Sequence, residues 1–202
     1  MHGDAGRNQQ SICVCDNAFV KNQHQYFNQR SKWLNKPILS GNFGTWLIEA
    51  SSLTARLQQR YVNFSVQTVR LQDERPLQDE AALLRSPSYQ FALVREVLLK
   101  GEGQAVVFAH SVLPKNSLRG AWNGLGKLGN KPLGATLFAN AKVKRRSLSY
   151  KKLSSNHALY QHAVRHIAHK PGYLWARRSI FSLNCASILV TEVFLPALLN
   201  KY

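Results

Sequence analysis

Two charged residues lie within runs of apolar residues, where an isolated ion is costly to bury. Arg95 stands in the middle of the alternating apolar row of residues 91–99, and Glu192 interrupts the apolar run of residues 188–195. Burial of such groups requires a partner of opposite charge. An arginine could bind a ligand carboxylate with two parallel hydrogen bonds, and a desolvated glutamate could donate or accept a proton. The alternative is a structural salt bridge that pairs Glu192 with Arg95 or with another arginine.

Histidines and cysteines are candidates for metal binding. His162, His166 and His169 are four and three residues apart, a spacing that could bridge a metal from one helix. No carboxylate or cysteine accompanies them in the sequence, which favours a solvated basic helix. Cys13 and Cys15 have no second ligand pair at a suitable spacing. The sequence therefore predicts no metal site.

The charge of the chain is strongly positive and unevenly distributed. It has 27 lysines and arginines against 10 aspartates and glutamates, so its formal net charge is +17, and only three acidic residues lie in residues 91–202. Such a field attracts anions, which could be nucleic acid, an anionic membrane surface or a small polyanionic substrate. The basic run of residues 142–152 contains a single aromatic residue, Tyr150. Because base stacking needs several aromatic side chains, we expect no nucleic-acid partner.

Length and hydropathy indicate one domain that does not enter a membrane. The chain has 202 residues, of which 45% are hydrophobic, enough for a substantial core. No apolar segment approaches the roughly 20 residues that cross a bilayer. The first four residues, Met1-His2-Gly3-Asp4, do not begin a signal peptide. We therefore expect a cytoplasmic protein.

Hydrophobic periodicity predicts the elements that must position these residues. Apolar residues at helical spacing predict helices over residues 45–60, with Thr45 as N-cap, and over residues 156–169. Residues 71–87, which carry charges and two prolines, are predicted to be a loop. The predicted strands span residues 61–71, 90–100, 104–113, 173–183 and 187–195. Antiparallel strands with a few helices indicate an α+β fold.

Three segments in this order resemble motifs of bacterial chorismate pyruvate-lyases. They are PLGATLF at 132–138, WARRS at 175–179 and LVTEVFLP at 189–196. The resemblance covers roughly residues 45–198. It implies a six-stranded antiparallel sheet flanked by helices, with a buried site under lid-like helical segments. It also implies an enzyme that uses no metal and no organic cofactor, and that splits chorismate into 4-hydroxybenzoate and pyruvate at the start of ubiquinone biosynthesis.

The resemblance assigns roles to four residues, Leu53, Arg95, Leu133 and Glu192. By the motifs that carry them, all four contact the ligand, and Arg95 and Glu192 are the catalytic pair. Arg95 would bind a carboxylate of chorismate, and Glu192 would lie at the ring hydroxyl. Leu53 and Leu133 would form apolar walls that exclude water. Two mechanisms stay open, because Glu192 could transfer a proton or could only orient the substrate during an internal hydrogen transfer.

One departure from the family concerns the second carboxylate of chorismate. Relatives often carry Gly-Arg where this chain has Ala109-His110, so a candidate partner for that carboxylate is missing. His110, Arg177 and Arg178 are the possible replacements, and the sequence does not choose among them.

The domain organisation and partners follow from the same resemblance. We expect an irregular N-terminal extension over residues 1–44 and a single domain over residues 45–202, with a basic insertion near 139–172. This insertion suggests weak contact with an anionic membrane surface. A monomer is expected, because no heptad seam is present. The main alternative function is a non-catalytic sensor domain for small aromatic acids, a class that has the same fold and usually follows a DNA-binding domain.

Overall fold

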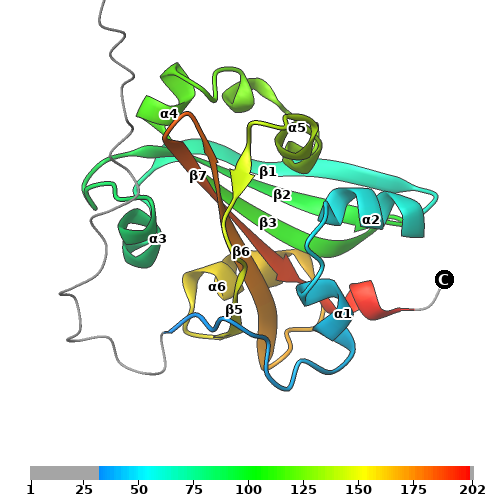
Figure 1. Ribbon diagram of the computed structural model, residues 1–202. Coiled ribbons are helices and arrows are strands. Elements are labelled where there is room, and N and C mark those ends of the chain that lie inside the picture. Colours follow the sequence, from blue (N-terminus) through cyan, green and yellow to red (C-terminus); the bar gives the residue numbers. More distant parts are fainter. Residues whose placement is uncertain (1–31, 201–202) are drawn as a thin grey trace, which may run out of the picture.

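One antiparallel sheet forms the centre of the computed structural model, which describes residues 32–200 (Figure 1). The strand order is β1-β2-β3-β7-β6-β4, and β5 also pairs with β6. The strands are β1 (Phe64–Glu74), β2 (Ala92–Gly101), β3 (Gln104–Pro114), β4 (Lys144–Arg145), β5 (Ser149–Ser154), β6 (Tyr173–Leu183) and β7 (Ala186–Phe194). The predicted α+β class and antiparallel sheet are confirmed.

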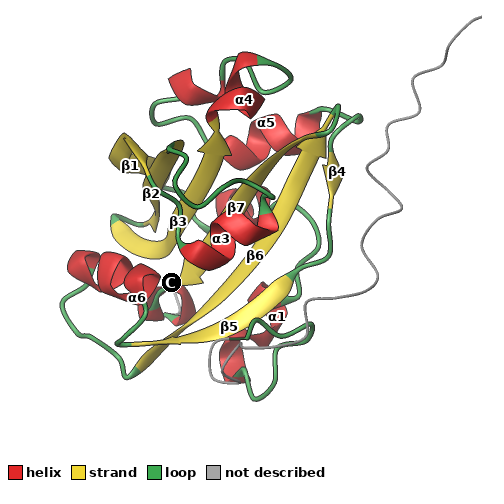
Figure 2. Cartoon of the chain, turned by 90° about the vertical axis from the view of Figure 1, so that its left-hand side faces the viewer, coloured by secondary structure: helices red, strands yellow, loops and turns green. Residues whose placement is uncertain are grey.

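Short helices cover the sheet, with α3 in front of it in the view of Figure 2. The α-helices are α1 (Gly44–Leu47), α2 (Leu53–Arg60), α3 (Gln78–Leu83), α4 (Lys115–Arg119), α5 (Leu133–Ala139) and α6 (Ala158–Ala163). The 3-10 helices are η2 (Gly41–Phe43), η3 (Leu125–Lys127), η4 (Val164–His166) and η5 (Pro196–Leu199). Across residues 32–200, every helix falls short of the length and apolarity needed to span a bilayer.

The sheet has seven strands among the described residues, not the predicted six. Two of the seven, β4 and β5, come from the basic segment near 139–172, where hydrophobic periodicity predicted no strand. In β5 the side chains of Tyr150 and Leu153 are buried. Two lysines separate these buried residues, so the sequence shows no alternation of apolar and polar residues here. One of them, Lys152, lies over the ring of Trp175, with its Nζ 5.3 Å from the ring centroid. Part of the expected insertion is therefore a strand in the sheet.

The predicted helix over residues 45–60 is interrupted. It forms α1 and α2, and residues 48–52 lie between them. The N-cap of α2 is Ser52, whose Oγ accepts a hydrogen bond from the Ala55 backbone N–H at 3.3 Å, whereas the predicted cap Thr45 lies inside α1. The reason for the interruption lies in the tertiary structure. The buried guanidinium of Arg177 requires acceptors, and it binds carbonyl groups at the end of α1.

The other predicted elements are confirmed in part. The hairpin of β2 and β3 has its turn at Gly101-Glu102-Gly103, and β6 and β7 match the last two predicted strands closely. The predicted loop over residues 71–87 is wrong, because β1 continues to Glu74 and α3 follows. The helix expected over residues 156–169 is shorter, forming α6 and η4. Its Leu159 is buried, so α6 is not the solvated helix that was expected.

The expected extension over residues 1–44 is described only from residue 32. Within that part, Leu34 exchanges two backbone hydrogen bonds with Tyr150 of β5, at 2.7 and 2.8 Å. The Trp33 indole N–H donates to Asp79 at 3.0 Å. Cys13 and Cys15 lie outside the described residues. The domain boundary at residue 44 stays a prediction.

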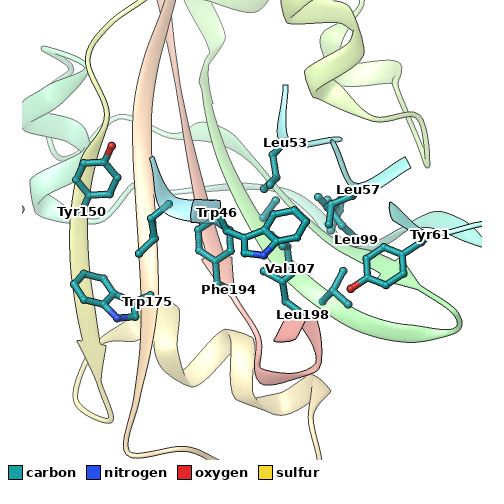
Figure 3. Packing of buried hydrophobic residues seen from close by; sticks show 14 residues of the cluster. Trp46, Leu53, Leu57, Tyr61, Leu99, Val107, Tyr150, Trp175, Phe194 and Leu198 are labelled. Carbon is teal, nitrogen blue, oxygen red and sulfur yellow. The ribbon is translucent and has the colours of Figure 1, made fainter. Parts of the chain in front are cut away.

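Both faces of the sheet are covered by apolar side chains. One face, called the front face here, carries Leu99, Val107 and Phe194, which pack against α1, α2 and η5 (Figure 3). The opposite or back face carries Leu98 and Phe108, which belong to a second cluster together with residues of α6. Because both faces are buried, the central strands are apolar along most of their length. The buried charges in these strands therefore stand out.

Candidate active site

A pocket lies on the front face, beneath the start of α2 and beneath α5. Its space is about 590 Å³, including its open side. Strands β2, β3, β6 and β7 form its floor. Leu53, Arg95, Leu133 and Glu192, the four residues predicted to contact ligand, all line it. Their assigned roles stay predictions, but the structure brings all four to one place.

Strand register explains why residues far apart in the sequence meet on this floor. Arg95 of β2 lies opposite Ser111 of β3, and Ala109 of β3 lies opposite Glu192 of β7. Glu192 in turn lies opposite Arg177 of β6. Residues directly opposite each other in an antiparallel pair share a face. Arg95, Glu192 and Arg177 therefore all belong to the front face.

The apolar roof is formed by two helices that approach closely. Leu53 begins α2, and Leu133 begins α5. A Cβ atom at Gly134 would lie only 3.1 Å from Thr54 Oγ1, so glycine permits this approach. The side chains of Leu53 and Leu133 are buried. Such walls exclude water and strengthen the electrostatic interactions within the pocket.

Arg95 is a buried cation that forms no ion pair among the described residues. Only 3% of its surface is exposed. Its Nη2 donates to the carbonyl oxygens of Gly129 and Lys131, both at 2.8 Å. Its Nε is buried and has no acceptor within residues 32–200. Burial lowers the pKa of Arg95. A ligand carboxylate would supply the missing acceptor and the missing negative charge.

Glu192 is paired with a different arginine. Its Oε2 accepts a hydrogen bond from Arg177 Nε at 2.5 Å, while the Arg177 side chain is fully buried and that of Glu192 is 17% exposed. Arg177 Nη1 also donates to the carbonyl of Glu49 at 2.6 Å. The predicted salt bridge between Glu192 and another arginine is thus present. It lies in the pocket, so the structural and the ligand-binding interpretations of Glu192 apply together.

A third arginine, Arg145 of β4, lines the pocket and was missed by sequence analysis. It donates from Nη1 to the carbonyl of Ala50 at 2.7 Å. Its guanidinium carbon lies 5.6 Å from the ring centroid of Phe138 and 5.3 Å from that of Phe181. The sequence offers no signal for this position, because Arg145 is one of several cations in a basic run. Only the pairing of β4 with β6 turns its side chain toward the pocket.

Two of the three replacements considered for the missing family arginine lie on the back face. His110 pairs with Glu96, its Nδ1 lying 3.0 Å from Glu96 Oε1. Arg178 donates from Nη1 to Asp79 Oδ2 at 2.6 Å. Neither residue lines the pocket. Each follows a front-face residue in its strand, and successive side chains of a strand point to opposite faces. Among the three, Arg177 alone lines the pocket.

The back-face charges form a compact network. His110 Nε2 lies 3.3 Å from Glu80 of α3, and His162 Nδ1 of α6 lies 2.8 Å from Glu96 Oε1. Burial alone would lower the pKa of His110, but Glu80 and Glu96 raise it to about 9. Burial alone would raise the pKa of Glu96, but hydrogen bonds from His110 and His162 lower it to about 2. This network ties α3 and α6 to the sheet.

The histidines singled out as candidate metal ligands are thus placed differently from the expectation. His162 contacts a carboxylate that the sequence places 66 residues away. Within the part of the chain that the structure describes, no group of three or more His, Cys, Asp or Glu side chains is arranged to hold a metal ion. His166 stacks instead near Phe108, with 6.1 Å between the ring centroids.

The fold and the pocket are those of a protein suited to bind a small anionic organic molecule. An antiparallel sheet presents buried arginines and one carboxylate to a pocket with apolar walls. The chain belongs to the chorismate lyase family, whose sequence model matches residues 27–202.

Named relatives agree with this membership. A protein of Methylobacillus flagellatus, named probable chorismate pyruvate-lyase, is 46% identical over 171 residues, which cover 85% of this chain and 96% of the relative. A protein of the same name from Thiobacillus denitrificans is 47% identical over 155 residues, covering 77% of this chain and 83% of the relative.

Similarity to solved structures extends to regulatory proteins. The ligand-binding domain of a GntR-family transcriptional regulator from Bordetella bronchiseptica aligns with a TM-score of 0.50. The alignment covers 66% of this chain and 85% of that domain at 14% sequence identity. At this identity the likeness concerns the fold alone.

Proposed function

We propose that this protein is a chorismate pyruvate-lyase, which converts chorismate into 4-hydroxybenzoate and pyruvate. Family membership and relatives of that name support the assignment. The observation in the structure that carries it is Arg95, a buried cation with an unfilled hydrogen-bonding position on the floor of an apolar pocket. Chorismate is a dianion with a ring that becomes aromatic in the product, so it matches both the charge and the walls.

In this proposal Arg95 binds the ring carboxylate, and Glu192 accepts a hydrogen bond from the ring hydroxyl. Both are catalytic residues because they contact the reacting molecule. Leu53 and Leu133 contact the ring and keep water out of the pocket. The Arg177 contact holds the Glu192 carboxylate in place, which reduces the reorganisation needed when substrate binds.

The reaction breaks the ether bond between the ring and the enolpyruvyl side chain. The ring carbon beside the ether loses a hydrogen, the hydroxyl on that carbon becomes the phenol, and the ring becomes aromatic. The side chain departs as pyruvate when its methylene carbon gains a hydrogen. An internal transfer of the ring hydrogen to that methylene carbon needs no protein base, and in the second route Glu192 carries the proton. In the first route the site acts through orientation and electrostatics. In the second route Glu192 adds general acid–base catalysis.

We propose that the reaction proceeds without a metal or an organic cofactor. The elimination is redox-neutral overall, so it needs no external oxidant or reductant. Aromatisation of the ring supplies the driving force, and the arginines stabilise the carboxylates. Addition of a strong chelator to the purified protein should leave turnover unchanged.

We propose that the enzyme is a cytoplasmic monomer that makes weak contact with an anionic membrane surface. Lys142, Lys144 and Arg146 are exposed on the segment near 139–172. Each basic residue close to an anionic bilayer contributes about 1 kcal/mol of attraction. Binding to anionic liposomes at low salt, and its loss at high salt, would support this contact. Sedimentation at micromolar concentration should give the mass of a single chain.

The test of the function is turnover of chorismate. Purified protein is mixed with chorismate, with no metal or cofactor added, and both 4-hydroxybenzoate and pyruvate are followed. Equimolar formation of the two products is expected. Tight binding of 4-hydroxybenzoate without any turnover would favour the alternative, a sensor of small aromatic acids. The 46–47% identity to relatives named as lyases favours the enzyme over that alternative.

A further inference from the structure

Arg145 occupies a place in the pocket that the proposed roles leave unused. It lines the pocket on the front face, and it also lines a broad groove on the outer surface beside β4. Its side chain is therefore part of the wall between the two. A residue in this position can contact a ligand in the pocket and still lie near solvent.

The contacts of Arg145 orient its guanidinium but do not satisfy it. Nη1 donates to the Ala50 carbonyl at 2.7 Å. The rings of Phe138 and Phe181, which contact each other edge to face, both lie within 6 Å of the guanidinium carbon. Its Nε is buried, with no acceptor among residues 32–200. Among these described residues Arg145 also forms no salt bridge. A buried N–H donor without an acceptor is uncommon in folded proteins, and a bound ligand is one explanation for it.

The charges around the pocket suggest which ligand group this is. Glu192 is paired with Arg177, so those two charges cancel. Arg95 and Arg145 then remain as the pocket arginines without a salt-bridge partner in the described part of the chain, although the charges of Glu192 and Glu49 also act on Arg145. Each has a buried Nε without an acceptor there. Two such cations match two carboxylates. Chorismate has one carboxylate on the ring and one on the enolpyruvyl side chain, whereas 4-hydroxybenzoate has one in total.

We propose that Arg145 binds the enolpyruvyl carboxylate of chorismate and so distinguishes substrate from product. This inference rests on the proposed function, in which Arg95 binds the ring carboxylate. Position 110 faces the back of the sheet, so His110 cannot make this contact, whereas Arg145 lines the pocket. After the ether bond breaks, the carboxylate that Arg145 holds belongs to pyruvate. The aromatic product then depends on Arg95 alone for its charge pairing.

The experiment compares substrate and product in the same variant. Arg145→Met keeps an apolar chain against the two rings and removes the charge. We expect the KM for chorismate to rise by about 30-fold or more, the lower limit for removing one partner of a buried charge pair. The dissociation constant of 4-hydroxybenzoate, measured by calorimetry, should change by less than about threefold. A purely structural role would instead weaken both ligands together.

Two further variants complete the test. Arg146→Met changes the neighbouring exposed cation and should leave both constants within about threefold of wild type. Arg145→Lys restores the charge without the guanidinium geometry, and it should recover part of the affinity for chorismate. If Arg145→Met fails to fold, Arg145→Lys replaces it in the comparison of substrate and product. An unchanged KM in a folded Arg145 variant, or an equal loss of affinity for both ligands, would overturn the inference.

Failure of the inference and failure of the proposed function give different results. The function is decided by the wild-type protein, which must form both products from chorismate. If the wild type binds chorismate without turnover, calorimetry with chorismate and with 4-hydroxybenzoate still measures whether Arg145 separates the two. If the wild type binds neither compound, both the function and the inference are wrong.

Discussion

The two faces of the sheet differ in how their buried charges are balanced. On the back face each buried cation that reaches α3 has a carboxylate beside it, as in the pairs His110–Glu80 and Arg178–Asp79. On the front face Arg95 and Arg145 have no carboxylate within salt-bridge distance among the described residues. The same strands supply both faces, because consecutive residues of a strand point to opposite faces. Their difference therefore reflects which residues face which side.

This contrast indicates what buried charge does on each face. A pair of opposite charges holds two elements together, and removing one partner is strongly destabilising because the other is left alone. A buried cation without a partner of opposite charge lowers stability. A role in stability therefore does not explain why it is present. On the back face the network fixes α3 and α6 to the sheet. On the front face the arginines without a salt-bridge partner are suited to bind an anion.

The largest expected effect is that of Arg95→Ala on product binding. Removing one partner of a buried charge interaction should weaken 4-hydroxybenzoate binding by roughly 2–5 kcal/mol. Calorimetry with 4-hydroxybenzoate measures this. Arg178→Ala is the matched control, because Arg178 is a buried arginine of the back face; it should lose stability and keep its affinity. Unchanged product affinity in a folded Arg95→Ala protein would contradict the assignment.

The second prediction concerns stability on the back face. Protonated His110 stabilises the fold, since its pKa is about 9 in the folded protein against 6.5 for an ordinary histidine. This stabilisation is complete below pH 6.5 and is lost as pH rises to 9, by up to about 3 kcal/mol. Urea unfolding across this range should show the decline.

Two variants test whether this pH dependence of stability comes from the back face. His110→Asn should flatten the decline in the free energy of unfolding between pH 6.5 and 9. Glu192→Gln, on the front face, should keep the wild-type slope. The acid side has the opposite sign, because the lowered pKa of Glu96 adds stability above pH 4.5 that is lost as pH falls toward 2. Equal slopes in His110→Asn and wild type would show that the network does not titrate as described.

The third prediction is a kinetic difference between two glutamates. Glu192→Gln should fold and should lower kcat about 100-fold, the lower end of the range for a group that positions or transfers a proton. Glu96→Gln changes a buried carboxylate on the opposite face, and it should lower stability while leaving kcat close to wild type. Steady-state kinetics and thermal unfolding of both proteins make the comparison. Normal turnover in Glu192→Gln would make Glu192 a structural residue only.

The smallest expected effect separates the apolar walls of the pocket from the core. Leu133→Ala should weaken 4-hydroxybenzoate binding about tenfold, as expected for lost contacts in a hydrophobic pocket. Leu159→Ala, in α6 behind the sheet, should lower the free energy of unfolding by about 2–5 kcal/mol and leave affinity nearly unchanged. Equal loss of affinity in the two variants would mean that the effect travels through general loosening of the fold.

Much of the fold was predictable because it depends on local patterns. Alternating residues predicted the β2–β3 hairpin and the strands β6 and β7, with small errors at their ends. Arg95 and Glu192 stood out because each breaks an apolar pattern. The predictions that were wrong concern short elements. The strand β4 has two residues, and α1 ends after four because its carbonyls bind Arg177.

By itself, the sequence determined the α+β class and the family, and it singled out four residues that line one pocket. It did so through hydrophobic periodicity and ordered motifs, which are properties of neighbouring residues. Only the tertiary structure decided that Glu192 pairs with Arg177, that His110 faces away from the pocket and that Arg145 enters it. These outcomes depend on strand register and on pairing between distant segments. One position along a strand turns a side chain to the opposite face, and composition carries no record of that choice.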